Sequence, residues 1–319
     1  MKINFIFMKG VIIKSTGNLC QVLSKNKEIY SCKIKGKTRL MNIEFTNPIA
    51  VGDNVEFSFD EKNKIGLINN IEKRKNYIIR KSVNLSHKSQ VIASNIDLAF
   101  LIVTLAHPVT SLNFIDRFLV QAGAYDIDAK IIFNKIDLYD KKLMKKKEKY
   151  QKIYEKIGYE TISTSIHSEK NLNKIKKLLF DKVTVFSGHS GVGKSSLVNL
   201  IEPNLSLKTK HISDYHGQGV HTTTYAEMFT LSSGGYIIDT PGIKGLGLID
   251  IDVDLLSRYF PEMFAAGQNC KFKNCIHVNE PKCAVLHELK NGQIEKSRYK
   301  NYLSMLEKNT NYRKNNYQS

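Results

Sequence analysis

The sequence lacks any apolar run of the roughly 20 residues that a membrane-spanning helix needs. The apolar stretch at residues 3–8 is too short for a signal peptide and has no small-residue cleavage site. We therefore expect a cytoplasmic protein that does not contact the membrane.

Cysteine is also scarce, with five in 319 residues. Disulfides are unusual in the cytoplasm, and the cysteines are unevenly spread: Cys20 and Cys32 stand apart, whereas three others lie close together near the C-terminus. Such clustering indicates a metal site. Three thiolates and one imidazole form the closed ligand set of a structural zinc, and the candidates are Cys270, Cys275, His277 and Cys283. This zinc would stabilise a unit whose own hydrophobic core is too small for it to fold well. The alternative is a set of buried free cysteines beside a surface histidine.

Acidic residues are few, with 30 against 48 lysines and arginines, so the formal net charge is +18. A field of this sign attracts polyanions, which favours a nucleic acid or a ribonucleoprotein as partner. The alternative is that a composition rich in Lys, Asn and Ile reflects coding bias.

Residues 1–75 contain short alternating apolar runs separated by turn residues, which predict a small β-barrel of the OB type. The expected strands are 10–14, 19–23, 29–34, 54–59 and 64–71. Such barrels commonly bind nucleic acid. Basic residues at every second position, Lys33, Lys35, Lys37 and Arg39, would share one face of a strand. They could bind a phosphate backbone, or they could protect an exposed edge strand against aggregation.

Residues 76–249 form the next predicted domain, which a polar linker over 76–90 introduces. Strands then alternate with helices, which predicts a doubly wound α/β sheet with its ligand at the carboxyl ends of the strands. The expected strands are 98–105, 129–133, 161–163, 182–187 and 236–238, and the expected helices are 114–124, 141–157, 172–179 and one that starts at 196. We interpret the lysines of helix 141–157 as a solvated face in preference to a dedicated binding site.

For residues 250–306 the sequence predicts a small, mostly helical unit that contains the cysteine cluster. Residues 307–319 are polar and basic, and we expect a disordered tail.

A phosphate-binding loop lies between the expected strand at 182–187 and the helix that Ser196 opens. Its glycines let backbone N–H groups surround a polyphosphate, Lys194 adds positive charge, and the Ser195 hydroxyl can ligate magnesium. The loop comprises Gly188, His189, Ser190, Gly191, Val192, Gly193, Lys194 and Ser195.

A second motif, Asn134-Lys135-Ile136-Asp137, follows the expected strand at 129–133. The Asp137 carboxylate can accept two hydrogen bonds from the N1–H and amino group of guanine, an edge that adenine does not present. Asn134 would brace the loop, and Lys135 would lay its stem along the base. A backbone N–H near Ser165 could reach the guanine carbonyl. The predicted ligand is therefore GTP.

The third part of the predicted site follows the strand at 236–238. Asp239 would hold the magnesium shell through water, and the Gly242 N–H would contact the γ-phosphate. Thr222 or Thr223 would ligate magnesium when that phosphate is present, which would make this loop a nucleotide-sensing switch. An ordinary polar loop would have the same composition.

The order of these motifs is inverted. Ras-like GTPases run from phosphate loop to Asn-Lys-x-Asp, whereas here Asn134 precedes Gly188, as a circular permutation would produce. The chain resembles the bacterial ribosome small subunit-dependent GTPase A family. The resemblance rests on the permuted order, the OB-like barrel, the His-Thr-Thr-Thr loop at 221–224 and the Cys/His cluster. The resemblance implies a GTPase that binds 16S ribosomal RNA through its flanking domains, acts late in maturation of the small ribosomal subunit and leaves on hydrolysis. We expect a monomer. The alternatives are an RNA-binding scaffold with GTP as a conformational ligand, and a permuted GTPase that serves another ribonucleoprotein.

Hydrolysis needs a group that orients the attacking water. In Ras-type enzymes this is a glutamine after the Asp-x-x-Gly glycine, but here the position is Ile243. His221 is the best substitute, since imidazole can orient or deprotonate water near neutral pH. We therefore predict His221 and Lys194 as catalytic residues. The alternative for His221 is a contact with the ribosome or a role in shaping the loop.

Overall fold

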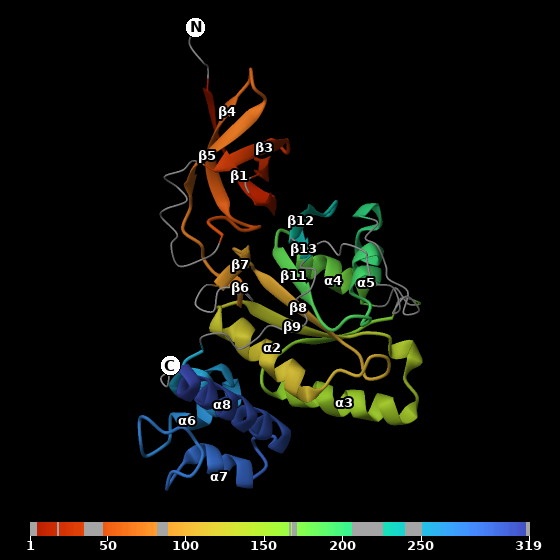
Figure 1. The fold of residues 1–319 in the computed structure, drawn as a ribbon. Helices are drawn as coiled ribbons and strands as arrows, with labels where there is room; N and C mark the ends of the chain where they lie inside the picture. Colours follow the sequence, from red (N-terminus) through yellow and green to blue (C-terminus); the bar gives the residue numbers. More distant parts are fainter. Residues whose placement is uncertain are drawn as a thin grey trace.

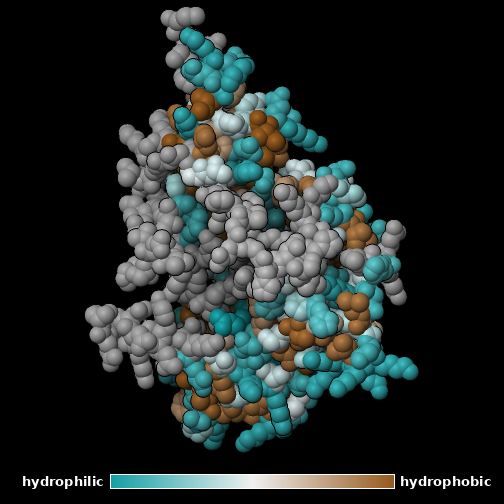
Figure 2. Space-filling view, turned by 45° about the vertical axis from the view of Figure 1, so that its right-hand side comes forward, coloured by the Kyte–Doolittle hydropathy of each residue, from teal (hydrophilic) through white to brown (hydrophobic). Residues whose placement is uncertain are grey.

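The computed structural model describes residues 5–17, 19–34, 47–81, 89–165, 167, 171–205, 226–239 and 251–316. Three parts follow one another along the chain and in space: a β-barrel at the N-terminal end, an α/β sheet in the middle and a helical unit at the C-terminal end (Figure 1). Hydrophobic and hydrophilic residues are interspersed on the described parts of the face in Figure 2. Within the described ranges, no helix combines the length and apolar character needed to span a bilayer.

The barrel is the predicted five-stranded one. It comprises β1 (Phe5–Thr16), β2 (Leu19–Ser24), β3 (Ile29–Ile34), β4 (Asn54–Asp60) and β5 (Ile65–Ile71). β1 pairs with both β2 and β4, and β3 pairs with β5, so the ring closes. Cys20 and Cys32 face each other across β2 and β3 in its core, where burial raises both thiol pKa values to about 12. Lys35, Lys37 and Arg39 lie outside the described residues.

The segment predicted as a linker is a β-hairpin, so that prediction was wrong. β6 (Tyr77–Lys81) pairs antiparallel with β7 (Ser89–Ser94). The hairpin is stabilised because Ile78, Ile79 and Val91 are buried. The sequence did not predict it because polar residues around these three leave no clear alternation of apolar and polar positions.

The central sheet has the strand order β10-β9-β8-β11-β13-β12. Its strands are β8 (Leu98–Val103), β9 (Asp128–Phe133), β10 (Thr161–Ser163), β11 (Val183–Ser187), β12 (Glu227–Thr230) and β13 (Tyr236–Asp239). All pairs are parallel except β12–β13. β12, which the sequence did not predict, also bridges to β1 at Glu227 and Lys14, so the barrel and the sheet are continuous.

Helices cover both faces of this sheet (Figure 1). One core contains α2 (Leu112–Ala124) and Tyr154 of α3 (Lys141–Lys156), and the other contains α4 (Leu172–Leu179) and α5 (Lys194–Ile201). Successive residues of β8 alternate between these two cores, as the pleat of a strand that is buried on both faces requires. The lysines of α3 are exposed apart from Lys147.

The C-terminal unit consists of the 3-10 turn η3 (Val253–Tyr259) and the helices α6 (Pro261–Gly267), α7 (Ala284–Lys290) and α8 (Lys296–Asn316). α8 extends to Asn316, into the segment 307–319 for which the sequence predicts a disordered tail. No glycine or proline interrupts the chain after 294, and a helix anchored by the buried Tyr302 and Met305 adds further turns at little cost.

A buried ion-pair network joins this unit to α2. Arg298 of α8 is 1% exposed and donates to Asp116 at 2.7 Å and to Glu262 at 2.7 and 3.0 Å. Tyr154 and Asn301 also donate to the Asp116 carboxylate. Burial opposes the charge on Arg298, but the two carboxylates raise its pKa, so the guanidinium stays charged.

Candidate GTP-binding and metal sites

The phosphate-binding loop runs from the end of β11 to the first residue of α5. Gly188, Gly191 and Gly193 have φ of +145°, +81° and +93°, in the region that favours glycine. A Cβ at Gly188 would lie 2.4 Å from the carbonyl oxygen of Ile102. Glycine therefore lets the loop curl closely over the carboxyl end of β8, and Ser195 and Ser196 follow in the first turn of α5.

Lys194 lies inside this loop. Its Nζ donates to the carbonyl oxygens of Gly188 at 2.7 Å and His189 at 2.9 Å. Burial lowers the pKa of Lys194, and the negative charge of Asp239 partly opposes this shift. The predicted phosphate lysine begins α5 and the predicted magnesium aspartate ends β13, the strand that pairs with β11, so both lie at the same edge of the sheet.

Asn134 connects the base-recognition motif to the phosphate loop. The side chain is fully buried, its Nδ2 donates to the carbonyl oxygen of Val192 at 2.9 Å, and its Oδ1 accepts from the Thr164 hydroxyl at 3.0 Å. A Cβ at Gly193 would lie 2.5 Å from Asn134 Nδ2, so glycine is also required there. Motifs more than 50 residues apart along the chain are in direct contact.

The rest of this motif lies on the same edge of the sheet. Lys135 has φ of +58°, and its Nζ donates to the carbonyl oxygens of Gly191 at 2.6 Å and His107 at 2.8 Å. Ile136 begins the 3-10 turn η1 (Ile136–Leu138), which contains Asp137. The Asp137 carboxylate accepts from the Ser165 hydroxyl and remains partly exposed, so it can still receive a ligand.

Two supporting contacts were not predicted from the sequence. The Tyr139 hydroxyl donates to the Asn134 carbonyl at 3.0 Å and accepts from the Leu105 N–H at 2.8 Å, and burial raises its pKa to about 12. The Phe114 ring of α2 stacks on His189 with centroids 3.8 Å apart. Burial, and then the charge of Lys194, lower the pKa of His189. The Tyr139–Leu105 and Phe114–His189 pairings join separate elements, so no local sequence pattern signals them.

Four of the predicted site residues lie outside the described residues. They are His221, Thr222, Thr223 and Gly242. The described half of the site therefore contains the phosphate loop, the base motif and Asp239.

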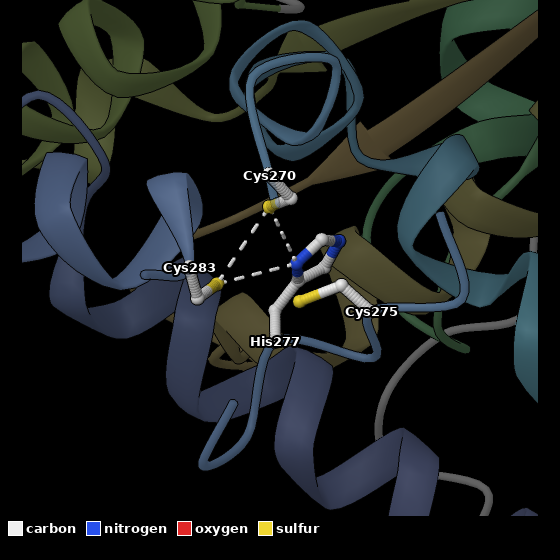
Figure 3. Close-up of side chains that lie close together, drawn as sticks. All are labelled: Cys270, Cys275, His277 and Cys283. Atoms are coloured by element: carbon white, nitrogen blue, oxygen red, sulfur yellow. Dashed lines mark hydrogen bonds between the residues drawn. The ribbon is translucent and has the colours of Figure 1, made fainter. Parts of the chain in front are cut away.

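The cysteine cluster is brought together by the loop between α6 and α7 (Figure 3). The Nδ1 atom of His277 lies 3.6 Å from Cys270 Sγ and 3.4 Å from Cys283 Sγ, and these two sulfurs are 3.9 Å apart. All four donor atoms, including Cys275 Sγ, lie within 4.8 Å of one another. A tetrahedral zinc with bonds of about 2.3 Å to sulfur and about 2.0 Å to nitrogen spaces its donors about 3.5–3.8 Å apart. The set can therefore hold a metal ion and is compatible with zinc.

Backbone contacts hold these ligands in position. The Tyr299 hydroxyl of α8 donates to the His277 carbonyl at 2.7 Å, and the Ala284 N–H donates to Cys270 Sγ at 3.3 Å. Burial raises the pKa of Cys275 to about 12 and lowers that of His277. A bound cation would instead lower the pKa of the Cys275 thiol, because a coordinating thiol is deprotonated.

A parallel sheet that carries a phosphate loop after β11 and a guanine motif after the earlier strand β9 defines a circularly permuted P-loop GTPase. The family comparisons agree. Residues 71–249 match the model of the RsgA GTPase, and residues 9–68 match that of the RsgA N-terminal domain. The chain belongs to the RsgA GTPase family, which confirms the resemblance noted from its motifs, and it is a GTP hydrolase.

Relatives and solved structures support this assignment over nearly the whole chain. The small ribosomal subunit biogenesis GTPase RsgA of Christiangramia forsetii is 50% identical and covers 98% of this chain and 100% of its own length. That of Flavobacterium psychrophilum is 51% identical over 94% of this chain and 93% of its own. The structure of YjeQ from Thermotoga maritima has a TM-score of 0.77 at 34% identity, covering 95% of this chain and 98% of its own. YloQ, a circularly permuted GTPase, has a TM-score of 0.75 at 30% identity, covering 96% of both chains.

Proposed function

We propose that this GTPase acts in the cytoplasm as a monomer, binds the small ribosomal subunit through its 16S ribosomal RNA and takes part in late maturation of that subunit. The relatives that match nearly the full chain are named small ribosomal subunit biogenesis GTPases. The charge of +18 and the closed N-terminal barrel suit an RNA partner.

The nucleotide is proposed to lie across the contact between Asn134 and Val192. Asp137 selects guanine, and the phosphates lie in the loop from Gly188 to Ser195. The Lys194 ammonium, which binds two carbonyl oxygens of its own loop, exchanges these for phosphate oxygens. This exchange favours the polyphosphate because the phosphate oxygens carry negative charge, whereas the carbonyl oxygens are neutral.

Magnesium would bind with GTP through the Ser195 hydroxyl, with Asp239 acting through water and Thr222 or Thr223 completing the shell. Magnesium would supply positive charge between the β- and γ-phosphates. His221 is proposed to orient the attacking water, since Ile243 stands where Ras-type enzymes have glutamine. The cysteine cluster is proposed to hold one structural zinc.

Release of the ribosomal subunit is proposed to follow hydrolysis. The single observation that carries the function is the direct hydrogen bond between the base motif and the phosphate loop, in permuted order, within a chain that matches the RsgA models. Steady-state GTP hydrolysis should be measured alone and with purified small subunits, large subunits or bare RNA. We expect strong stimulation by small subunits only.

Stimulation by none of these particles would favour an RNA-binding scaffold, and stimulation by another particle would favour a different ribonucleoprotein partner. His221→Ala is expected to lower the single-turnover rate on small subunits at least tenfold, which corresponds to about 1.4 kcal/mol of transition-state stabilisation. An undiminished rate would exclude this role for His221.

A further inference from the structure

A groove of about 430 Å³ lies between α3, from Lys145 onward, and the turn that leads into α8. α3 belongs to the GTPase domain and α8 to the C-terminal unit, and residues of both line the groove. The wall formed by α3 carries Lys145, Lys149, Lys152 and Lys156. None of them is part of the nucleotide site or the metal site. We call this feature the lysine groove.

The four lysines share one face of the helix. Their spacing of four, three and four residues keeps them within about 60° around the axis and extends about 16 Å along it. Lys156 donates to the backbone and side-chain oxygens of Gln293 on the opposite wall, at 3.0 and 3.2 Å. Among the described residues, Lys145, Lys149 and Lys152 have no ion-pair partner, and all three are exposed.

The groove keeps an excess of positive charge. Arg298 and Glu262 also line it, but they bind each other in two hydrogen bonds. The carboxylates that remain are those of Glu148 and Glu295, against four ammonium groups.

We propose that the lysine groove binds the sugar–phosphate backbone of RNA. This rests on the proposed function, which supplies an RNA partner. Lysine binds phosphate as a point charge, so a row of exposed lysines can contact successive phosphates of a backbone. No described residue that lines the groove is aromatic, so it offers no platform on which bases could stack.

The position of the groove gives this contact a structural consequence. Its walls come from two domains, so one RNA strand in it contacts both α3 and the C-terminal unit. RNA bound there stabilises the arrangement in which Lys156 contacts Gln293.

The test compares two double variants of the same helix in the full-length protein. Lys149→Gln with Lys152→Gln removes two charges from the groove, and Lys142→Gln with Lys146→Gln removes two exposed charges that do not line it. Binding to purified small subunits and to a double-stranded RNA is titrated between 50 and 300 mM KCl in the presence of a non-hydrolysable GTP analogue. Basal GTP hydrolysis and thermal unfolding serve as controls, and neither variant should change them.

We expect the groove variant to reduce the slope of log K against log salt by about 1.5, and to weaken binding about tenfold or more at 0.1 M salt. The control variant should keep the wild-type slope. Equal slopes for the two variants would overturn the proposal, because the lysines would then act only through net charge. Weaker binding to subunits with an unchanged slope would also overturn it and would indicate a ribosomal protein as the contact. If the wild-type protein does not bind small subunits, the proposed function fails, and the RNA titration alone decides the groove.

Discussion

Replacing Asn134 by alanine should disconnect the guanine motif from the phosphate loop. The buried amide donates to the Val192 carbonyl at 2.9 Å and accepts from the Thr164 hydroxyl at 3.0 Å. Alanine removes both bonds. The Thr164 hydroxyl is left without this acceptor, and the Val192 carbonyl is left without this donor.

The size of the effect follows from these two bonds. A lost hydrogen bond costs about 1 kcal/mol net, and a buried carbonyl left unpaired costs about 1–3 kcal/mol. We therefore expect the free energy of unfolding to fall by about 2–4 kcal/mol. The same bond sets the distance between Asp137 and the phosphate loop, so the dissociation constant for GDP should rise at least tenfold, about 1.4 kcal/mol.

Asn76→Ala is the matched control. Asn76 is 5% exposed and exchanges two hydrogen bonds with Ile96, at the opposite end of β8 from the nucleotide site. It should lose comparable stability and keep its GDP affinity, because distant sites act independently.

Equilibrium urea unfolding and titration with fluorescent GDP measure the two effects. Wild-type GDP affinity in Asn134→Ala would refute the coupling role of this residue. Equal losses of affinity in both variants would show that general destabilisation, not the contact between the loops, weakens nucleotide binding.

Three further predictions concern the phosphate loop, the domain junction and the metal. Gly188→Ala should abolish measurable nucleotide binding and destabilise the fold by at least about 2 kcal/mol, since its Cβ would lie 2.4 Å from the Ile102 carbonyl oxygen at a φ of +145°. Arg298→Met should cost about 3–5 kcal/mol in urea unfolding, because Asp116 loses its buried cation. Chelation of the metal should unfold the C-terminal unit, seen as lost helical circular dichroism.

Each of these has its own control. Gly17 also has a positive φ, of +65°, but a Cβ there would meet no neighbouring atom within 4 Å. Gly17→Ala should therefore lower the free energy of unfolding less than Gly188→Ala does, and equal losses would argue against the steric clash. For Arg298→Met, an unchanged midpoint would show that the network adds no stability. For the metal, Cys275→Ser should lose zinc by atomic emission and Cys20→Ser should retain it. Equal zinc content in both would rule out the cluster as the ligand set.

The placement of the phosphate loop and the base motif at the ends of strands was predictable from the sequence because each motif is local. The glycines of the phosphate loop and the Asn134–Asp137 motif follow apolar strands directly, so both the loops and the edge of the sheet could be inferred. The cysteine cluster was predictable for the same reason, since all its ligands lie within residues 270–283.

The hairpin β6–β7 and the extension of α8 were not predictable in this way. In the hairpin, a few apolar residues are buried against distant elements while their neighbours are polar, so local composition indicated a linker. The residues after Leu306 are mostly polar, so local composition indicated a tail, although α8 extends to Asn316. β12 is a short edge strand whose pairing with both β13 and β1 depends on the assembled sheet.

By itself, the sequence determined the class of ligand, the permuted order and the four candidate ligands of a metal ion, because these depend on residue types at short spacing. The tertiary structure alone decided that Asn134 holds Val192, that Arg298 joins Asp116 to Glu262, and that lysines spread along one helix line a groove between two domains. The physical reason is the range of the interactions. Hydrogen bonds and charge pairs act over a few ångströms in space, and only packing of the cores brings residues 58 or 182 positions apart within that distance.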